Sequence, residues 1–234
     1  MDDATRFLIV NADDFGQSRA VNGGIIEAHE KGIVTSASLM VRWPHVDEAV
    51  ALAREHPGLS VGLHLDLGEW TLEGGEWIPR YEVARLDDER AVADVIAEQL
   101  SRFRTLLGRD PTHLDSHQHV HQRSPVRKLM QQVAADLGVS LRGFGSIRYC
   151  GAFYGQADDG RSLPDAIGVT ALLGILNGLE EGWTELACHP AAGDDLQTMY
   201  RLERMEELRT LCDARIPPAM RALGIELVSF GASR

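Results

Sequence analysis

Short apolar segments alternate with longer amphipathic segments along the chain, and this alternation predicts its secondary structure. Each apolar segment has the length of a buried strand, and each amphipathic segment gathers its apolar residues on one helical face. The predicted strands are residues 7–12, 36–41, 60–67, 112–117, 139–144, 184–189 and 225–230. The predicted helices are residues 18–31, 45–56, 87–107, 124–137, 164–179, 198–213 and 217–223.

Strands that alternate with helices indicate an α/β fold with a parallel sheet and crossover helices. No linker or repeat divides the sequence, so we expect residues 1–234 to form a single domain. Residues 68–86 and 145–163 lack a clear period, and the first of these stretches is predicted to be an active-site loop. A distorted (β/α) barrel of about seven mostly parallel strands and an open doubly wound sheet both fit this order of elements.

Composition narrows the classes of function. The 234 residues carry 23 basic and 35 acidic side chains, a formal charge of −12, which argues against nucleic-acid and anionic-membrane partners. A hydrophobic content of 44% excludes a fully disordered chain. We expect no membrane span, because no apolar run reaches about 20 residues, and no secretory signal pattern is present. Together with three scattered cysteines, which are typical of reduced thiols, these features predict a cytoplasmic protein.

Four of the nine histidines fall between residues 113 and 121. In this segment His113, Asp115, His117, His119 and His121 occupy alternate positions, so on a continuous strand they share one face. Same-face neighbours on a strand lie about 6.6 Å apart, whereas a metal–histidine bond measures about 2 Å. At most two of these groups can therefore reach one ion, and we expect the others to support the site or contact substrate.

Polar side chains also end other predicted strands. Asp13 and Asp14 follow the first strand, where one carboxylate can bind a metal while its neighbour acts as a general base. His64 lies on the strand face opposite to its flanking leucines, and His189, at the end of residues 184–189, is a candidate general acid. Because catalytic groups of (β/α) barrels converge at the carboxyl ends of the strands, this distribution favours the barrel over the open sheet.

Aromatic residues fall in or near the two predicted loops, namely Trp70, Trp77, Phe153 and Tyr154. Their side chains can stack on sugar rings, and they can equally pack the loops against the rest of the protein. The sequence leaves both interpretations open.

Several motifs together identify a family resemblance. NADDFG (residues 11–16), GIVTSAS (32–38), VGLHL (61–65), PTHLDSHQHVH (111–121), AFYG (152–155) and ELACHPA (185–191) occur in this order. In them the chain resembles the YdjC-like carbohydrate deacetylases, which include the chitooligosaccharide deacetylases. The resemblance covers nearly the whole chain, although the loop after the third strand is short compared with the chitooligosaccharide enzymes.

The resemblance implies a distorted (β/α) barrel that binds a divalent cation, Mg²⁺ or Zn²⁺, and hydrolyses an N-acetyl group from an amino sugar. Carried over by motif position, Asp14, His64 and His117 correspond to metal ligands and Asp13 to the general base. His189 corresponds to the general acid, by analogy with other metal-dependent polysaccharide deacetylases. The resemblance also implies a homodimer.

Two other classes of function remain open at this stage. A metal-dependent sugar isomerase or phosphoesterase can use a similar barrel, since a fold does not fix a function. A phosphoesterase is expected to hold phosphate with basic residues, and Arg142 and Arg148 could serve. A non-catalytic, metal-dependent sugar-binding protein is the second alternative, but such a protein needs neither the paired aspartates nor His189.

Overall fold

The structure is a computed structural model that describes residues 5–232. Its centre is a sheet with the strand order β7-β6-β3-β2-β1-β9-β8, in which β10 pairs with β1 and neighbouring strands run parallel. The strands of this sheet are β1 (Arg6–Phe15), β2 (Ser36–Leu39), β3 (Ser60–Leu65), β6 (His113–Ser116), β7 (Ser140–Leu141), β8 (Arg148–Cys150), β9 (Gly182–Cys188) and β10 (Ile225–Leu227).

Strand β1 lies at the middle of the sheet. Its apolar run Leu8, Ile9 and Val10 is fully buried, as expected for a central parallel strand with both faces covered. It pairs with β9 from Arg6 to Ala12, while its other side meets first β10 and then β2. The residues that follow the apolar run, including the two aspartates, are thereby held at the carboxyl edge of the sheet.

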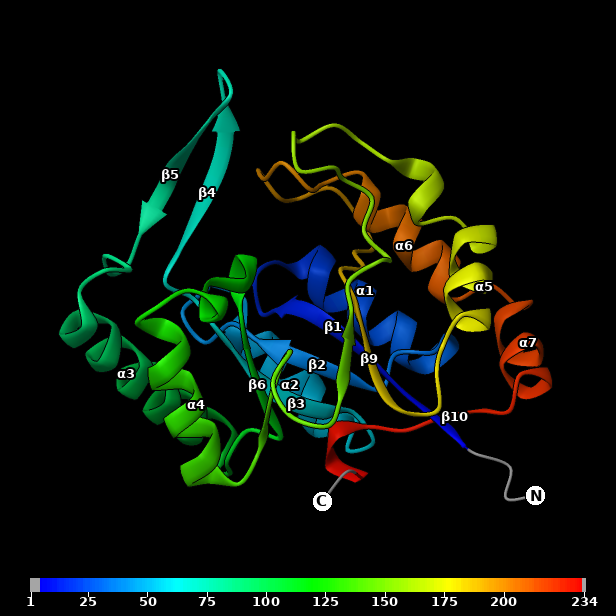
Figure 1. Ribbon diagram of the computed structural model, residues 1–234, viewed down its shortest axis with the longest axis horizontal. Coiled ribbons are helices and arrows are strands. Elements are labelled where there is room, and N and C mark those ends of the chain that lie inside the picture. Colours follow the sequence, from blue (N-terminus) through cyan, green and yellow to red (C-terminus); the bar gives the residue numbers. More distant parts are fainter. Residues whose placement is uncertain (1–4, 233–234) are drawn as a thin grey trace.

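Helices surround the sheet (Figure 1). They are α1 (Arg19–Lys31), α2 (Val46–Glu55), α3 (Glu89–Leu107), α4 (Val126–Leu137), α5 (Val169–Asn177), α6 (Glu203–Leu211) and α7 (Ile216–Ala222). Short 3-10 turns are η1 (His117–Gln122), η2 (Pro164–Ala166) and η3 (Phe230–Ala232). Helices α3 and α4 flank the β6 end of the sheet, and α5, α6 and α7 flank the other side (Figure 1).

Helix boundaries agree with local capping signals. The Ser18 hydroxyl accepts a hydrogen bond from the Val21 N–H at the start of α1. Gly108 and Gly138 end α3 and α4 in the left-handed conformation that glycine adopts without steric cost. Within residues 5–232, none of the helices combines the length and the apolar character needed to cross a membrane.

The sheet curls around its buried core without closing, because the described residues of edge strands β7 and β8 do not pair with each other. One hydrophobic cluster fills the space between the sheet and its helices. The predicted distorted (β/α) barrel of mostly parallel strands is therefore confirmed. The sheet is not the open doubly wound sheet that was its alternative.

Some predicted elements differ from the structure. Residues 68–86 are largely not a loop but an antiparallel hairpin, β4 (Gly68–Glu73) and β5 (Glu76–Glu82). The predicted strand 139–144 is reduced to β7, and the last predicted strand ends at Leu227 before η3. The predicted irregular stretch 145–163 contains the short strand β8.

The strand predicted at residues 112–117 extends too far at its carboxyl end. The strand stops at Ser116, and His117 begins the turn η1, in which Gln118 and His119 have positive φ angles of 48° and 53°. The alternation that placed five metal-competent side chains on one face therefore breaks after Asp115, because a left-handed turn does not continue the period of a strand.

Candidate functional site

The carboxyl ends of four strands meet at one cavity of about 620 Å³. Asp13 and Asp14 come from β1, His64 from β3, His117 from the turn after β6, and His189 from the residue after β9. Each of the five lines this cavity, as the sequence predicts. Its volume lies within the range of about 300–1,000 Å³ that is common for small-molecule sites.

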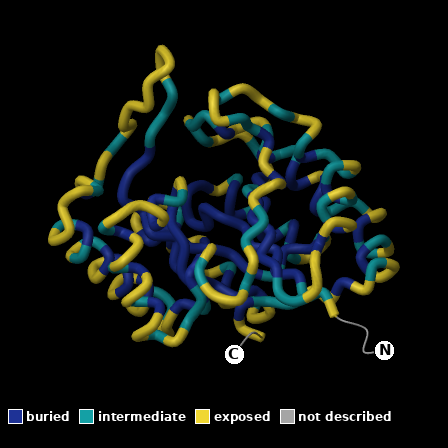
Figure 2. The backbone as a smooth tube through the Cα atoms, viewed as in Figure 1, coloured by how far each residue is buried: buried dark blue, intermediate teal, exposed yellow. Residues whose placement is uncertain are grey.

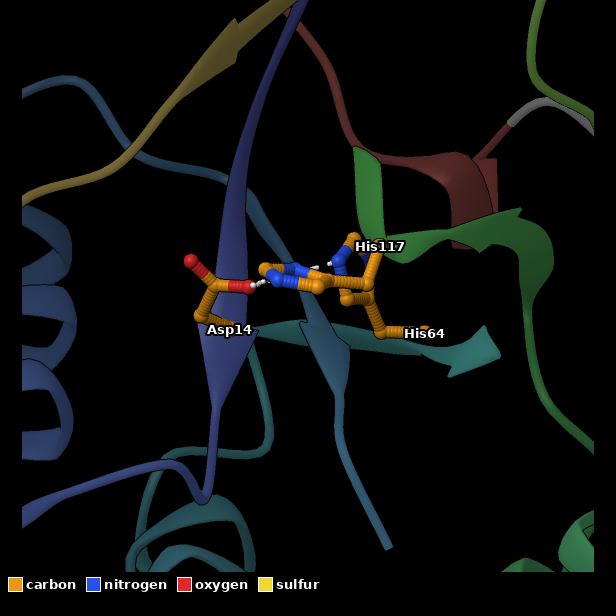
Figure 3. Close-up of side chains that lie close together, drawn as sticks. All are labelled: Asp14, His64 and His117. Carbon is orange, nitrogen blue, oxygen red and sulfur yellow. Dashed lines mark hydrogen bonds and ion pairs between the residues drawn. The ribbon is translucent and has the colours of Figure 1, made fainter. Parts of the chain in front are cut away.

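Asp14, His64 and His117 form a compact group (Figure 3). Oδ1 of Asp14 lies 3.3 Å from Nε2 of His64 and 3.0 Å from Nδ1 of His117. Asp14 has a positive φ of 68°, an uncommon backbone conformation for a residue with a Cβ. This turn directs its carboxylate toward the two rings, which come from neighbouring parts of the sheet.

The donor set of this group fits a divalent cation. Nδ1 of His64 donates to Oδ1 of Asp115 at 2.8 Å, so Nε2 is the nitrogen that faces Asp14. A carboxylate that orients a histidine in this way is a common support of metal ligands. Two ligand atoms on one ion, each about 2.1 Å from it, lie roughly 3–3.4 Å apart, as these atoms do. Three protein ligands leave coordination positions for water and substrate.

Charge around the group is arranged to favour ionised carboxylates. Burial opposes the charge of Asp14, but Arg204 and His117 outweigh this effect and hold its pKa well below the usual value. Burial also opposes a charge on His64, yet Asp115 and Asp13 outweigh it and raise the pKa of His64 well above its usual value. Without a cation, the positive charge between these carboxylates is thus carried by a proton on His64.

Asp13 has a different partner. Nη1 and Nη2 of Arg142 donate to its two oxygens, both at 2.6 Å, and Asn11 donates to Oδ1 at 2.9 Å. Burial alone raises the pKa of Asp13, but Arg142 outweighs it and brings the pKa below its usual value. Asp13 is therefore a buried, oriented carboxylate that lines the cavity.

Arg142 also joins Asp13 to two further acids. It contacts Oδ2 of Asp115 and Oε1 of Glu185, both at 2.7 Å, and its side chain is fully buried. Burial raises the pKa of Glu185 to about 7, although Arg142 partly offsets this rise. All three carboxylates contact the guanidinium group of Arg142. Arg142 is consequently not free to bind a phosphate, which was the role that the sequence left open for it in a phosphoesterase.

Arg148 does not supply a phosphate site either. Its guanidinium donates to the backbone carbonyl oxygens of Glu180 and Glu181, and it is not among the residues that line the cavity. Neither arginine named for a phosphoesterase therefore faces the candidate site.

His189 lies beside Asp13, with Nε2 3.7 Å from Oδ2. Its other ring nitrogen is 3.9 Å from Oε1 of Glu207, and its backbone N–H donates to Oε2 of the same residue. The rings of Tyr154 and Tyr200 contact the imidazole edge to face. Burial lowers the pKa of His189 to about 4, against the opposite effect of Asp13. The imidazole is thus neutral at pH 7.

The rest of the histidine-rich segment surrounds the group without joining it. His113 contacts the hydroxyls of Ser38 and Thr112 and stacks on Phe230, and Asp115 accepts from His64. Nε2 of His119 is hydrogen-bonded to the hydroxyl of Tyr149 at 3.0 Å, and His121 contacts Ser116. His117 is accordingly the member of this segment that lies with Asp14 and His64.

Four further buried residues contact the site residues, and the sequence does not reveal these contacts. They are Arg142, Glu185, Arg204 and Glu207. Glu185 carries a weak signal, because it shares a strand face with Ala187 and lies four residues before His189. Arg204 and Glu207 lie on α6, far along the chain from Asp14, and nothing in their local sequence marks them.

The family profile described as YdjC-like protein matches residues 7–222. This chain belongs to the YdjC-like family. Among its relatives, the carbohydrate deacetylase of Geobacillus stearothermophilus is 33% identical, over 96% of this chain and 97% of that protein. The chitooligosaccharide deacetylase of Klebsiella pneumoniae strain 342 is 35% identical, over 96% and 98% of the two chains. The resemblance seen in the motifs is thus confirmed over nearly the full length.

A solved structure shares this fold over nearly its full length. The protein from Enterococcus faecalis V583 described as a cellobiose-phosphate cleavage protein is 27% identical and gives a TM-score of 0.78. The match covers 98% of this chain and 99% of that one. Strand order and helix placement described above are therefore those of a known fold.

Proposed function

We propose that this protein is a metal-dependent hydrolase that removes an N-acetyl group from an amino sugar, in a chitooligosaccharide or a related glycoconjugate. The observation that carries the proposal is the Asp14, His64 and His117 group, which lies beside Asp13 and His189 in one cavity. The deacetylase names of its YdjC-like relatives support the reaction.

Asp14, His64 and His117 are the residues that would hold the cation, Mg²⁺ or Zn²⁺. Such an ion polarises a carbonyl and lowers the pKa of bound water when present. Arg204 donates to Oδ2 of Asp14 at 2.6 Å, which leaves Oδ1 directed at the histidines. Asp115 fixes the orientation of the His64 ring through its hydrogen bond to Nδ1.

Asp13 would accept the proton of the attacking water. Arg142 keeps this carboxylate ionised and fixed in direction, so no rotation is needed before it accepts a proton. The water oxygen then forms a bond to the acetyl carbon. That both aspartates line the same cavity supports this role, since the acceptor must lie close to the water that it activates.

His189 would give a proton to the leaving nitrogen. Because the imidazole is neutral at pH 7, it must first receive a proton, and Asp13 is 3.7 Å from its Nε2. The proton taken from water can therefore pass to His189 and then to the amine as the C–N bond breaks. The second proton of the water stays on the new carboxylic acid, so the immediate products are acetic acid and the free amine of the sugar, which become acetate and an ammonium group in water.

The test is acetate release from N-acetylated chitooligosaccharides, measured with and without a chelator. We expect chelation to abolish turnover and His117→Ala to reduce it by at least about 10³-fold, because one ligand is lost. His45→Ala is the matched control, since His45 lies at the start of α2, away from the cavity, and we expect normal activity. Undiminished turnover in His117→Ala would contradict the proposal.

The same purified protein can be used to distinguish the alternative functions from this one. A sugar-binding protein would bind the oligosaccharide without releasing acetate. An isomerase or phosphoesterase would be inactive on these substrates and active on a sugar or sugar phosphate. The cytoplasmic location, the homodimer and the single domain over residues 1–234 stay predictions from the sequence.

A further inference from the structure

The β4–β5 hairpin projects from the body of the protein beside the carboxyl edge of the sheet (Figure 1). Its register pairs Trp70 with Pro79 and Leu72 with Trp77. Directly paired residues share a face of a hairpin, so these four residues form one apolar face. The opposite face pairs Thr71 with Ile78 and Glu73 with Glu76. The two faces of the hairpin thus differ sharply in character near its tip.

The base of this hairpin is fixed to the candidate site. The backbone N–H of Trp70 donates to Oε1 of Gln118 at 2.9 Å, and Nε2 of Gln118 donates to the Trp70 carbonyl at 2.8 Å. Gln118 directly follows His117 in the chain. Leu72 N–H also contacts Sδ of Met199, from the loop before α6, at 3.1 Å. These contacts hold the apolar face at a set position relative to the metal group.

Trp70 and Trp77 lie on the same face but in different surroundings. Trp70 is partly buried and packs against the hydrophobic core, so it anchors the hairpin. Trp77 is 55% exposed near the tip, where the hairpin is mostly exposed (Figure 2). Both residues line the cavity that contains Asp14 and His117. Packing therefore accounts for Trp70 and leaves the exposed ring of Trp77 without an explanation.

A large aromatic side chain that stays exposed along a ligand cavity is typical of a binding surface. One side of a pyranose ring carries C–H groups, and this side is covered well by the flat face of an indole. The indole brings no charge, which suits a neutral sugar. Trp77 lies on the hairpin and not at the sheet edge, so a ligand that reaches both would meet it at a different part from the catalytic groups.

We infer that Trp77 stacks on a sugar ring other than the one that loses its acetyl group, and that it determines how strongly longer saccharides are preferred. This inference rests on the proposed deacetylase function. Ile78 provides a comparison within the same strand, because it is 37% exposed, lies on the opposite face and does not line the cavity.

The experiment compares Trp77→Ala, Trp77→Phe and Ile78→Ala on N-acetylated chitosugars of increasing length, from the monosaccharide upward. For Trp77→Ala we expect little change with the monosaccharide and a loss of roughly three- to tenfold in kcat/KM with the longer sugars, the range of one aromatic contact. The loss should lie in KM, with kcat retained. Trp77→Phe should keep most of the preference for length, and Ile78→Ala should match the wild type.

Binding of the same sugars, measured by calorimetry on metal-loaded protein, separates this inference from the proposed function. If the wild type releases no acetate but binds longer sugars more tightly, and Trp77→Ala removes that preference, the function is wrong and the inference holds. An unchanged preference for length in Trp77→Ala, an equal loss with every sugar, or the same loss in Ile78→Ala would overturn the inference.

Discussion

Asp13 and Asp14 are neighbours in the sequence and almost equally buried, but their surroundings differ. Both oxygens of Asp13 are held by one guanidinium, that of Arg142. Asp14 divides its oxygens, with Oδ2 on Arg204 and Oδ1 directed at His64 and His117. A carboxylate held at both oxygens is oriented but has little freedom to bind a cation, whereas the divided one offers an oxygen.

The side chains of Asp13 and Asp14 are identical, so the difference between their proposed roles must come from the residues that contact each of them. Adjacent residues of a regular strand face opposite sides. The positive φ of Asp14 changes the backbone direction, and both carboxylates reach the same cavity. A strained backbone at this point is typical of a functional site, because the surrounding structure must hold it in place.

The largest expected effect comes from exchanging each carboxylate for its amide. Asp14→Asn should lose bound metal and turnover together, and added metal should restore part of the activity. Asp13→Asn should keep the metal but lose about 10²–10⁴-fold in kcat, the contribution of a general base. Metal content after dialysis and acetate release measure the two effects. Loss of metal in Asp13→Asn with retention in Asp14→Asn would reverse the assignment.

The two arginines should differ in their effect on stability. Arg142→Met removes the buried guanidinium from Asp13, Asp115 and Glu185 and leaves only His64 to offset their charge, so we expect a loss of about 3–5 kcal/mol in the free energy of unfolding. Arg204→Met uncovers Asp14 alone, which keeps its two histidines, so the loss should be smaller. Denaturant unfolding at pH 7 measures both.

Arg85→Met serves as the control for these variants, because Arg85 and Asp87 form an exposed pair at the surface. We expect no measurable change in its unfolding free energy. If Arg142→Met does not fold, Arg142→Lys supplies the comparison. A larger loss in Arg204→Met than in either Arg142 variant would show that the Asp14 side carries the greater buried charge.

The smallest expected effect concerns protons. The raised pKa of His64 means that this ring is charged at pH 7 without metal, and binding of a cation must release about one proton. Metal affinity should therefore rise with pH, by about tenfold per unit below the pKa of His64. Calorimetry in buffers of different ionisation enthalpy measures the release.

Asp115→Asn sharpens this prediction, because Asp115 is the largest contributor to the raised pKa of His64. The variant should release fewer protons on binding metal, and it should bind metal more weakly because the ring is less well oriented. Metal binding without proton release in the unmodified protein would mean that His64 is neutral before the ion arrives.

Much of the fold could be predicted from the sequence, because buried parallel strands and amphipathic helices each leave a local pattern. The β4–β5 hairpin was not predicted, since residues 68–86 were expected to form a loop. Gly74-Gly75 lies between its strands, and a glycine pair is a recognised hairpin signal. Strand β5 is mostly exposed, and with Trp77, Ile78 and Pro79 in a row it lacks a regular alternation of apolar and polar residues, so the period that would identify it is weak.

The site could be predicted only in part. The sequence predicts that Asp13, Asp14, His64, His117 and His189 lie together at the strand ends, and the structure brings them to one cavity, although the resemblance was needed to say which aspartate binds the metal. The arginines that distinguish the two aspartates could not be predicted in this way. Arg142 is 129 residues away from Asp13 along the chain, and Arg204 is 190 residues away from Asp14. Such pairings are set by the fold, and no local pattern records them.

The distance between Asp14 and Arg204 along the chain also affects the order of folding. Strand β1 is the first described element to be synthesised, but it pairs with β9 and β10, and the partner of Asp14 lies on α6. A chain that stops before residue 182 contains both aspartates but lacks these strands and this charge. Contacts between such distant residues form slowly, since long loops must close first. We therefore expect the cation site to be among the last parts of the protein to form.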